Sequence, residues 1–207
     1  MEKQYRFILL GSGTNFTCQV LRQLLSDNLI PFAYVQHGTQ PIAISSHFAN
    51  IPVINKAPPH AMHSLLTSSH IPMLYHQQLQ LAQWIRQQDI DFLLVACWPE
   101  LIGMDVIGSV NCAALNLHPS LLPAFRGFDP ISDQLHANKN EFGISLHLLN
   151  ECFDCGDIVL QQAITADRNP ERNEVETRCA RQGAKLFHQA MRSFSQPGWS
   201  LKKQETI

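Results

Sequence analysis

One run of seven residues, Asp91-Phe92-Leu93-Leu94-Val95-Ala96-Cys97, constrains the fold of this sequence more than any other feature. After the initial aspartate, every residue of the run is apolar. A strand with one face in water alternates apolar and polar residues, so an uninterrupted apolar run indicates a strand that is covered on both faces. The sequence therefore predicts an α/β fold, in which helices cover both faces of a sheet.

Further apolar runs alternate with segments that can form helices. We expect strands at residues 6–10, 31–35, 52–54, 112–117, 143–149 and 157–162. We expect helices from residue 14 or 15 to about residue 25, and at residues 77–88, 128–139 and 170–195. This order is typical of a Rossmann-like fold with an open, mostly parallel, twisted sheet. Because no repeat or low-complexity linker interrupts it, residues 1–207 are expected to form a single domain.

Composition narrows the classes of protein to which the chain can belong. Hydrophobic residues make up 45% of the sequence and charged residues 15%, as in an ordinary soluble globular protein. The net charge of −2 argues against a general nucleic-acid-binding protein. No apolar run is long enough to span a membrane, and the N-terminus lacks the apolar segment of a signal peptide, so we expect a cytoplasmic protein.

The cysteines and histidines show no metal-binding pattern, and no metal is expected. The six cysteines lie mostly in apolar runs and are expected to be reduced. Cys152 and Cys155 form a CxxC motif near His147, but no second closely spaced pair completes a zinc site, and the motif does not open a helix as redox motifs do. Its role, if any, stays open. Four histidines between residues 57 and 88 are expected on the surface: His60, His63, His70 and His76.

A glycine-rich turn, Gly11-Ser12-Gly13-Thr14-Asn15, follows the first predicted strand and leads into an amphipathic helix, with Thr14 or Asn15 as its N-cap. This arrangement presents backbone N–H groups and a helix N-terminus to an anion. The third glycine of a dinucleotide-binding fingerprint is replaced by Phe16, so the turn does not match the NAD-binding pattern. The turn either binds a phosphate or only makes a tight connection.

Asn116 and His118 stand at the end of the predicted strand 112–117. Side chains two residues apart on a strand point to the same face. Pro119 holds His118 in an extended conformation and ends the strand. An amide donor and an imidazole therefore lie at the carboxyl end of a strand, where open α/β sheets bind ligands.

The phrase from Asn116 to Pro123, Asn-Leu-His-Pro-Ser-Leu-Leu-Pro, is followed by Arg126-Gly127 and later by Phe153-Asp154-Cys155-Gly156. This combination resembles the signature of the 10-formyltetrahydrofolate-dependent formyltransferases, and the separation between His118 and Asp154 matches that of the family. The resemblance covers about residues 90–165 firmly and roughly the first thirty residues loosely.

The resemblance implies formyl transfer from 10-formyltetrahydrofolate, as co-substrate, to an amine without a metal or a covalent nucleophile. Asn116 and a protonated His118 would stabilise the oxyanion, while Asp154 would favour the imidazolium and act in proton transfer. The residues implied for folate binding are Trp98, Leu101, Ile102, Asn150, Glu151, Phe153 and Gly156. Those implied for acceptor binding are Gly11, Ser12, Gly13, Thr14, Asn15, Arg126 and Gly127. Residues 1–90 would form the acceptor half, and residues 91–207 the folate-binding and catalytic half.

The identity of the amine acceptor stays open. Glycinamide ribonucleotide formyltransferases follow the signature with a His-containing segment, whereas Arg126-Gly127-Phe128-Asp129-Pro130 is similar to the methionyl-tRNA and amino-sugar enzymes. Methionyl-tRNA formyltransferases carry an additional C-terminal domain, and this chain offers no basic surface in its place. A small amine is therefore expected as partner, with a nucleotide-linked amino sugar as first choice and methionyl-tRNA or glycinamide ribonucleotide as alternatives.

Two further hypotheses use the same residues. A formyltetrahydrofolate hydrolase would take water as the acceptor, although such hydrolases usually carry an N-terminal regulatory domain. A folate-binding module would keep the motif without turnover. The oligomeric state stays open, with a homodimer as one option.

Overall fold

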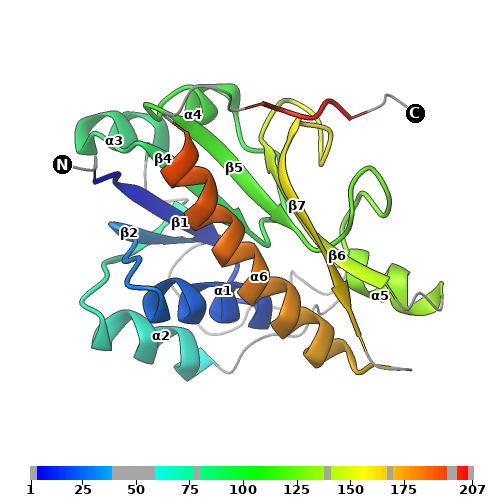
Figure 1. Cartoon of the computed structure of the whole chain (residues 1–207). Coiled ribbons are helices and arrows are strands. Elements are labelled where there is room, and N and C mark those ends of the chain that lie inside the picture. The colour runs from blue at the N-terminus through cyan, green and yellow to red at the C-terminus, as the bar shows by residue number, and fades with distance from the viewer. Residues whose placement is uncertain are drawn as a thin grey trace.

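Seven strands form one open sheet in the order β3-β2-β1-β4-β5-β6-β7 (Figure 1). The first five strands of this order run parallel, whereas β6 pairs antiparallel with both β5 and β7. This computed structural model describes residues 4–38, 59–76, 80–137, 141–166, 170–194 and 200–204. The predicted Rossmann-like, mostly parallel sheet is confirmed.

Helices connect most of the strands along the chain. The strands are β1 (Phe7–Gly11), β2 (Ala33–Gln36), β3 (Met73–Tyr75), β4 (Phe92–Ala96), β5 (Ala113–His118), β6 (Glu141–Leu148) and β7 (Ile158–Thr165). The helices are α1 (Asn15–Ser26), α2 (Pro59–Ser68), α3 (Leu81–Gln88), α4 (Met104–Ile107), α5 (Pro130–His136) and α6 (Arg172–Ser193).

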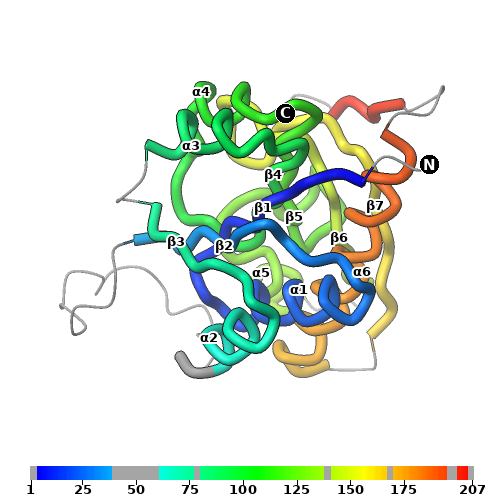
Figure 2. The backbone as a smooth tube through the Cα atoms, turned by 90° about the vertical axis from the view of Figure 1, so that its left-hand side faces the viewer, coloured from blue at the N-terminus to red at the C-terminus, as the bar shows by residue number. Residues whose placement is uncertain are grey.

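Alternate side chains of the strands divide the core into two clusters, one on each face of the sheet. On β1, Phe7 and Leu9 belong to one cluster, while Ile8 and Leu10 belong to the other. Helices α1, α2 and α6 pack in the first cluster, and α3 and α4 pack in the second (Figure 2). Because helices cover both faces, β1 and β4 are buried along their whole length, as the uninterrupted apolar run predicted.

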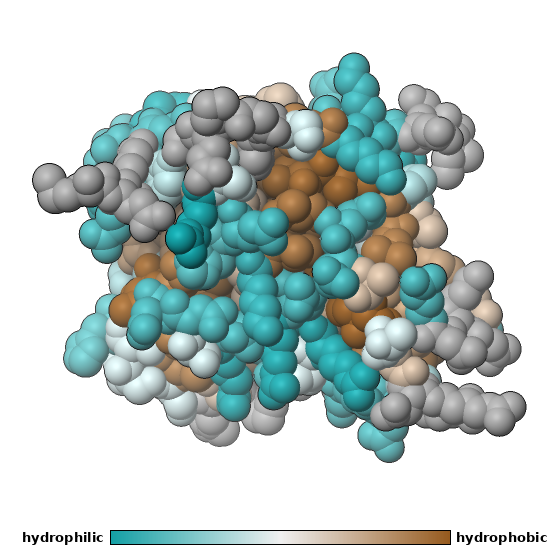
Figure 3. Space-filling view, in the orientation of Figure 1, coloured by the Kyte–Doolittle hydropathy of each residue, from teal (hydrophilic) through white to brown (hydrophobic). Residues whose placement is uncertain are grey.

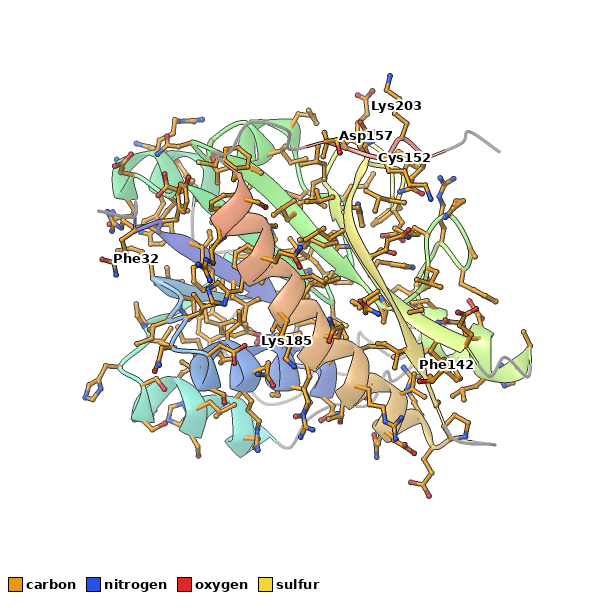
Figure 4. All side chains as sticks on the ribbon, viewed as in Figure 1. Phe32, Phe142, Cys152, Asp157, Lys185 and Lys203 are labelled. Atoms are coloured by element: carbon orange, nitrogen blue, oxygen red, sulfur yellow. A yellow bond between two sulfur atoms is a disulfide. The ribbon has the colours of Figure 1, made fainter. Side chains whose placement is uncertain are left out.

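The long helix α6 lies across the first face of the sheet (Figure 1). Its buried residues recur every three to four positions, which gives one apolar stripe against the sheet. Hydrophilic residues form a band across this face of the molecular surface (Figure 3). The exposed Lys185 of α6 is labelled in Figure 4. Among the described residues, no helix combines the length and the apolarity that crossing a membrane requires.

The segment between residues 57 and 88 differs from the prediction. The structure contains α2 and β3 there, and neither was expected. β3 is a three-residue edge strand with half-buried side chains, and its apolar run is too short to distinguish a strand from another element. Helix α3 begins at Leu81 rather than at residue 77. The strand expected at residues 52–54 lies outside the described residues.

Two later helices also differ from the prediction. The short α4 was not expected. Helix α5 begins later than residue 128 because Asp129 acts as its N-cap, accepting a hydrogen bond from the Ser132 N–H, with Pro130 in the first turn.

The expectation of reduced cysteines was wrong for one pair. Cys152 and Cys155 form a disulfide within the β6–β7 loop. The other four cysteines are free thiols, and burial raises the pKa of Cys18 and Cys97 to about 11 and that of Cys179 to about 12. Cys18, Cys97 and Cys179 therefore stay protonated at neutral pH.

The expectation of surface histidines holds for two residues and was wrong for a third. His63 and His70 are exposed, whereas the His76 side chain is half-buried. Burial, together with the neighbouring His37, lowers the pKa of His76. The side chain of His60 lies outside the described part of the structure.

Candidate active site

Asn116 and His118 lie at the carboxyl end of β5, where the parallel part of the sheet meets the antiparallel pair. The antiparallel register places His147 of β6 directly opposite Asn116. The β6–β7 loop then carries Asp154 back toward all three side chains. The sequence prediction that Asn116, His118 and Asp154 lie together is therefore met by the geometry.

The carboxylate of Asp154 is the centre of this cluster. Its Oδ1 lies 3.3 Å from Nδ2 of Asn116 and 3.3 Å from Nδ1 of His118. The same oxygen lies 3.5 Å from Nε2 of His147. Oδ2 accepts a hydrogen bond from the backbone N–H of Gly127 at 3.1 Å. Donors from two strands and one loop thus surround a carboxylate whose side chain is only 10% exposed.

These contacts decide the charge of Asp154. Burial alone raises the pKa of the carboxyl, but the hydrogen bonds from His118 and His147, the charge of His118 and the Gly127 amide outweigh burial and hold the pKa well below its usual range. Asp154 is therefore ionised at neutral pH. A carboxylate with such a low pKa is a weak base but a strong partner for a cation.

His118 is held between two oxygen acceptors. Its Nδ1 faces Asp154, and its Nε2 lies 2.8 Å from the backbone oxygen of Phe125. Because both oxygens only accept hydrogen bonds, a doubly protonated imidazolium satisfies both contacts. Phe125 and Asp154 have φ angles of 55° and 54°, in the left-handed region that non-glycine residues rarely adopt. Such backbone conformations are typical of functional sites.

His147 is a site residue that the sequence reasoning did not assign. Its Nε2 lies 3.0 Å from Nδ2 of Asn116, its Nδ1 lies 2.8 Å from the Leu148 backbone oxygen, and its side chain is 1% exposed. The signal in the sequence was a pair of polar residues, Ser145 and His147, two apart in an otherwise apolar strand. That spacing puts both on one face of β6, opposite His118 and Asn116.

A pocket of about 370 Å³ opens beside the cluster. Asn116, His118 and Asp154 form one side of it. Most of the residues expected to bind folate also line it: Trp98, Leu101, Ile102, Asn150 and Phe153. The apolar residues Leu101 and Phe153 are each 52% exposed, as suits a pocket rim that contacts a flat aromatic ligand.

Two of the residues expected to contact folate lie elsewhere. Neither Glu151 nor Gly156 lines this pocket. A Cβ atom on Gly156 would lie 1.8 Å from the backbone oxygen of Leu148. Gly156 therefore serves the close approach of two backbone segments rather than a ligand.

The glycine-rich turn, expected to bind the acceptor, reaches the same pocket through Ser12 and Thr14, whereas Gly11, Gly13 and Asn15 do not line it. Gly13 has a φ angle of 69°, so a glycine is favoured there. Thr14 is the N-cap of α1 and accepts a hydrogen bond from the N–H of Thr17.

A buried carboxylate stands beside this turn. Nδ2 of Asn15 donates to Oε2 of Glu176 at 2.9 Å, and Glu176 is 1% exposed on α6. One helical turn earlier, Arg172 forms an ion pair with Asp129 at 2.9 Å. Both Glu176 and Arg172 line the pocket. The turn therefore faces one acidic group and one paired cation, and neither was predicted from the sequence.

Of the remaining two residues expected to bind the acceptor, Gly127 lines the pocket and Arg126 does not. Arg126 donates to Oε1 of Gln204 at 2.7 Å, and Nε2 of Gln204 donates to the backbone oxygens of Asp154 and Gly156 at 2.9 and 2.7 Å. Ile158 and Lys202 exchange two backbone hydrogen bonds, each N–H donating to the oxygen of the other residue. The segment 200–204 thus holds the loop that carries Asp154 in place through these hydrogen bonds.

Comparisons with known proteins point to one family. The family model described as formyl transferase matches residues 7–191. The phosphoribosylglycinamide formyltransferase of Bacillus subtilis is 28% identical over 180 residues, covering 85% of this chain and 86% of that protein. The methionyl-tRNA formyltransferase of Syntrophomonas wolfei is 31% identical over 107 residues, which is 52% of this chain. The chain spans only 34% of the length of that relative.

Solved structures show the same fold. Glycinamide ribonucleotide transformylase 1 from Symbiobacterium toebii superposes with a TM-score of 0.70 at 18% identity, covering 98% of this chain and 95% of the other. The N-formyltransferase from Helicobacter canadensis, in complex with folinic acid and dTDP-3-aminofucose, gives a TM-score of 0.65 at 16% identity, covering 99% and 69%. Because the family model matches most of the chain, this protein belongs to the formyl transferase family.

Proposed function

We propose that this protein transfers a formyl group from 10-formyltetrahydrofolate to the primary amine of a small acceptor. The observation that carries the proposal is the convergence of Asn116, His118 and Asp154 on one side of the pocket. Membership of the formyl transferase family supports the reaction class. The apolar rim formed by Trp98 and Leu101 supports a folate site in the same pocket.

The three polar side chains suit the charge that develops in this reaction. When the amine nitrogen attacks the formyl carbon, a nitrogen–carbon bond forms and the formyl oxygen becomes an oxyanion. The amide of Asn116 and the imidazolium of His118 are hydrogen-bond donors for that oxygen, which replaces one of their present acceptors. Donors of this kind each contribute about 2.7–4 kcal/mol to transition-state stabilisation in other enzymes. The intermediate then collapses as the bond from the formyl carbon to the folate nitrogen breaks.

Asp154 acts in this scheme mainly through its charge. Its lowered pKa keeps it ionised, so that it offers His118 a charged hydrogen-bond acceptor and holds the ring in a fixed orientation. The proton lost by the attacking amine moves toward the folate nitrogen that leaves, with Asp154 or a water beside it as the relay. His147 orients the Asn116 amide through the 3.0 Å contact between their side chains.

The acceptor in this proposal is a small amine that carries a phosphate or a nucleotide, with a nucleotide-linked amino sugar as first choice. The N-terminus of α1 supports a phosphate because the first backbone N–H groups of the helix, apart from that of Thr17, have no partner within the helix. Residues 1–90 form the acceptor half in this scheme, and residues 91–207 the folate half. Glycinamide ribonucleotide is the second candidate, because the Bacillus subtilis relative matches over 86% of its own length.

Turnover with a panel of acceptors tests the proposal. Folate product is followed by absorbance with 10-formyltetrahydrofolate and one amine at a time: glycinamide ribonucleotide, several nucleotide-linked amino sugars, and methionyl-tRNA. A reaction without amine is the control. Product with one amine alone supports the transferase and identifies its acceptor. Equal product without amine indicates a hydrolase, and folate binding without product indicates a binding module; either result refutes the proposed transfer.

A further inference from the structure

Three side chains with metal-binding chemistry meet outside the catalytic cluster. His37 follows β2, His76 follows β3, and Glu100 follows β4, so all three stand at the carboxyl ends of parallel strands. One ligand atom from each lies within 4.8 Å of the other two. No pattern in the sequence indicates this group, because the three residues are far apart along the chain and only the order of the strands brings them together.

The two imidazoles of this group are incompletely satisfied. Nε2 of His37 and Nδ1 of His76 are shielded from solvent, and neither has a hydrogen-bond partner of acceptable geometry among the described residues. The His37 side chain is 10% exposed, and its Nε2 lies 3.1 Å from Oε1 of Glu100. Buried polar atoms normally have partners, so two such nitrogens in one place need an explanation.

The rings are also held in place by packing. The His37 and His76 rings stack with centroids 5.6 Å apart and planes 15° apart. Trp98 meets both rings edge-on, at centroid distances of 5.0 Å and 5.2 Å. The contacts with Trp98 therefore limit the movement of both imidazole rings.

We propose that His37, His76 and Glu100 form a binding site for a divalent transition-metal ion of the Zn²⁺ type. Two imidazole nitrogens and one carboxylate oxygen suit Zn²⁺ and its neighbours, whereas Mg²⁺ and Ca²⁺ prefer oxygen ligands. Ligand atoms around tetrahedral Zn²⁺ lie about 3.3 Å apart, since each is about 2.0–2.2 Å from the metal. The Glu100 side chain is 56% exposed, so it has room to change its conformation. Three protein ligands leave a coordination position open.

The site adjoins the pocket that the proposed function assigns to folate. Trp98 and Glu100 both line that pocket. A metal ion bound to Glu100 would fix the segment 98–102 relative to the ends of β2 and β3. This step rests on the proposed function. We expect the bound metal to increase the affinity of the protein for folate, and folate to increase its affinity for the metal by the same factor, because such coupling is reciprocal.

Direct metal titration tests the site without any assay of turnover. Untagged protein is freed of metal with a chelator and titrated with Zn²⁺ against a coloured competitor; Co²⁺ then reports the coordination by its visible absorption. Wild type should bind one equivalent of Zn²⁺. His76→Ala and Glu100→Gln should each weaken binding by about tenfold or more, as the loss of groups that hold a metal does. His63→Ala, which removes an exposed histidine of α2, is the matched control and should bind like wild type.

Thermal unfolding keeps the test independent of variant folding. Zn²⁺ should raise the Tm of wild type and His63→Ala but not that of Glu100→Gln, whose altered side chain is 56% exposed and can change without loss of the fold. Absence of stoichiometric binding, or equal weakening by His63→Ala and His76→Ala, would overturn the proposal. Binding of 5-formyltetrahydrofolate that is unaffected by Zn²⁺ would refute only the coupling, and failure to bind folate would refute the proposed function while the metal result stands.

Discussion

Replacement of Asp154 by Asn is the sharpest test of the candidate active site, because it removes one charge and keeps the shape. The amide oxygen can still accept the hydrogen bond from Gly127, now 3.1 Å from Oδ2. The charge-assisted contact with His118 is lost. The uncharged amide nitrogen of the new side chain faces the His118 ring instead. A hydrogen bond to a charged group contributes about 1.5–3 kcal/mol, so we expect Asp154→Asn to lower the free energy of unfolding by about that amount.

The effect on catalysis should be larger than the effect on binding. Asp154→Asn should reduce kcat by about 10²- to 10⁴-fold, the usual range for a positioned proton-transfer group, and leave the Kd for folate nearly unchanged. Steady-state turnover, folate titration and urea unfolding of the same preparation measure the three quantities. Asp157→Asn, in the same loop, is the matched control. Turnover like that of wild type would remove Asp154 from the mechanism.

The pH dependence of the unfolding free energy provides a second test of Asp154 with the same variant. The pKa of Asp154 is lower in the folded protein than in the unfolded chain, where it is about 3.9. Its contribution to stability is therefore fully present above that value and is lost as the pH falls toward the folded-state pKa. The difference in unfolding free energy between wild type and Asp154→Asn should be full at pH 6 and shrink below about pH 4. A difference that grows on acidification would contradict this assignment.

Three further substitutions test other parts of the site. His147→Gln should lower kcat roughly 10- to 100-fold, as one lost hydrogen bond in a charged network implies, and should leave the folate affinity unchanged. An unchanged kcat would show that His147 is only structural. Gly156→Ala should lower the unfolding free energy by about 2 kcal/mol or more, since its Cβ would clash with the Leu148 backbone; a Tm equal to that of wild type would refute the close approach. Glu176→Gln should lower the KM of a phosphate-bearing acceptor by about tenfold, which corresponds to about 1.4 kcal/mol of binding free energy. A higher KM would instead assign Glu176 to acceptor binding.

The fold could be predicted from the sequence wherever a segment is buried on both faces. Strands β1 and β4 are covered by helices on each side, so nearly every residue in them is apolar and the signal is strong. The edge strand β3 is half-buried and only three residues long, so its short apolar run does not distinguish a strand from another element. Prediction therefore failed at this edge of the sheet, where the strand is very short, whereas the strand expected at residues 157–162 matches β7 at the opposite edge.

The candidate site shows the same division. Asn116, His118 and Asp154 could be named in advance because a continuous phrase and a fixed spacing carry them. His147 could not be assigned, because its place opposite Asn116 depends on the register of two antiparallel strands. Arg126 was expected at the acceptor, yet it contacts Gln204, a residue 78 positions away along the chain.

The sequence by itself determined the α/β class, the position of the central strands, the two polar residues at the carboxyl end of β5 and Asp154 further along the chain. These depend on local periodicity and on a motif that is continuous along the chain. The tertiary structure alone decided the surroundings that give those residues their chemistry: the low pKa of Asp154, the buried Glu176 beside the turn, and the meeting of His37 with His76 and Glu100. Each of these depends on strand order and helix packing, which bring together residues that no local pattern relates.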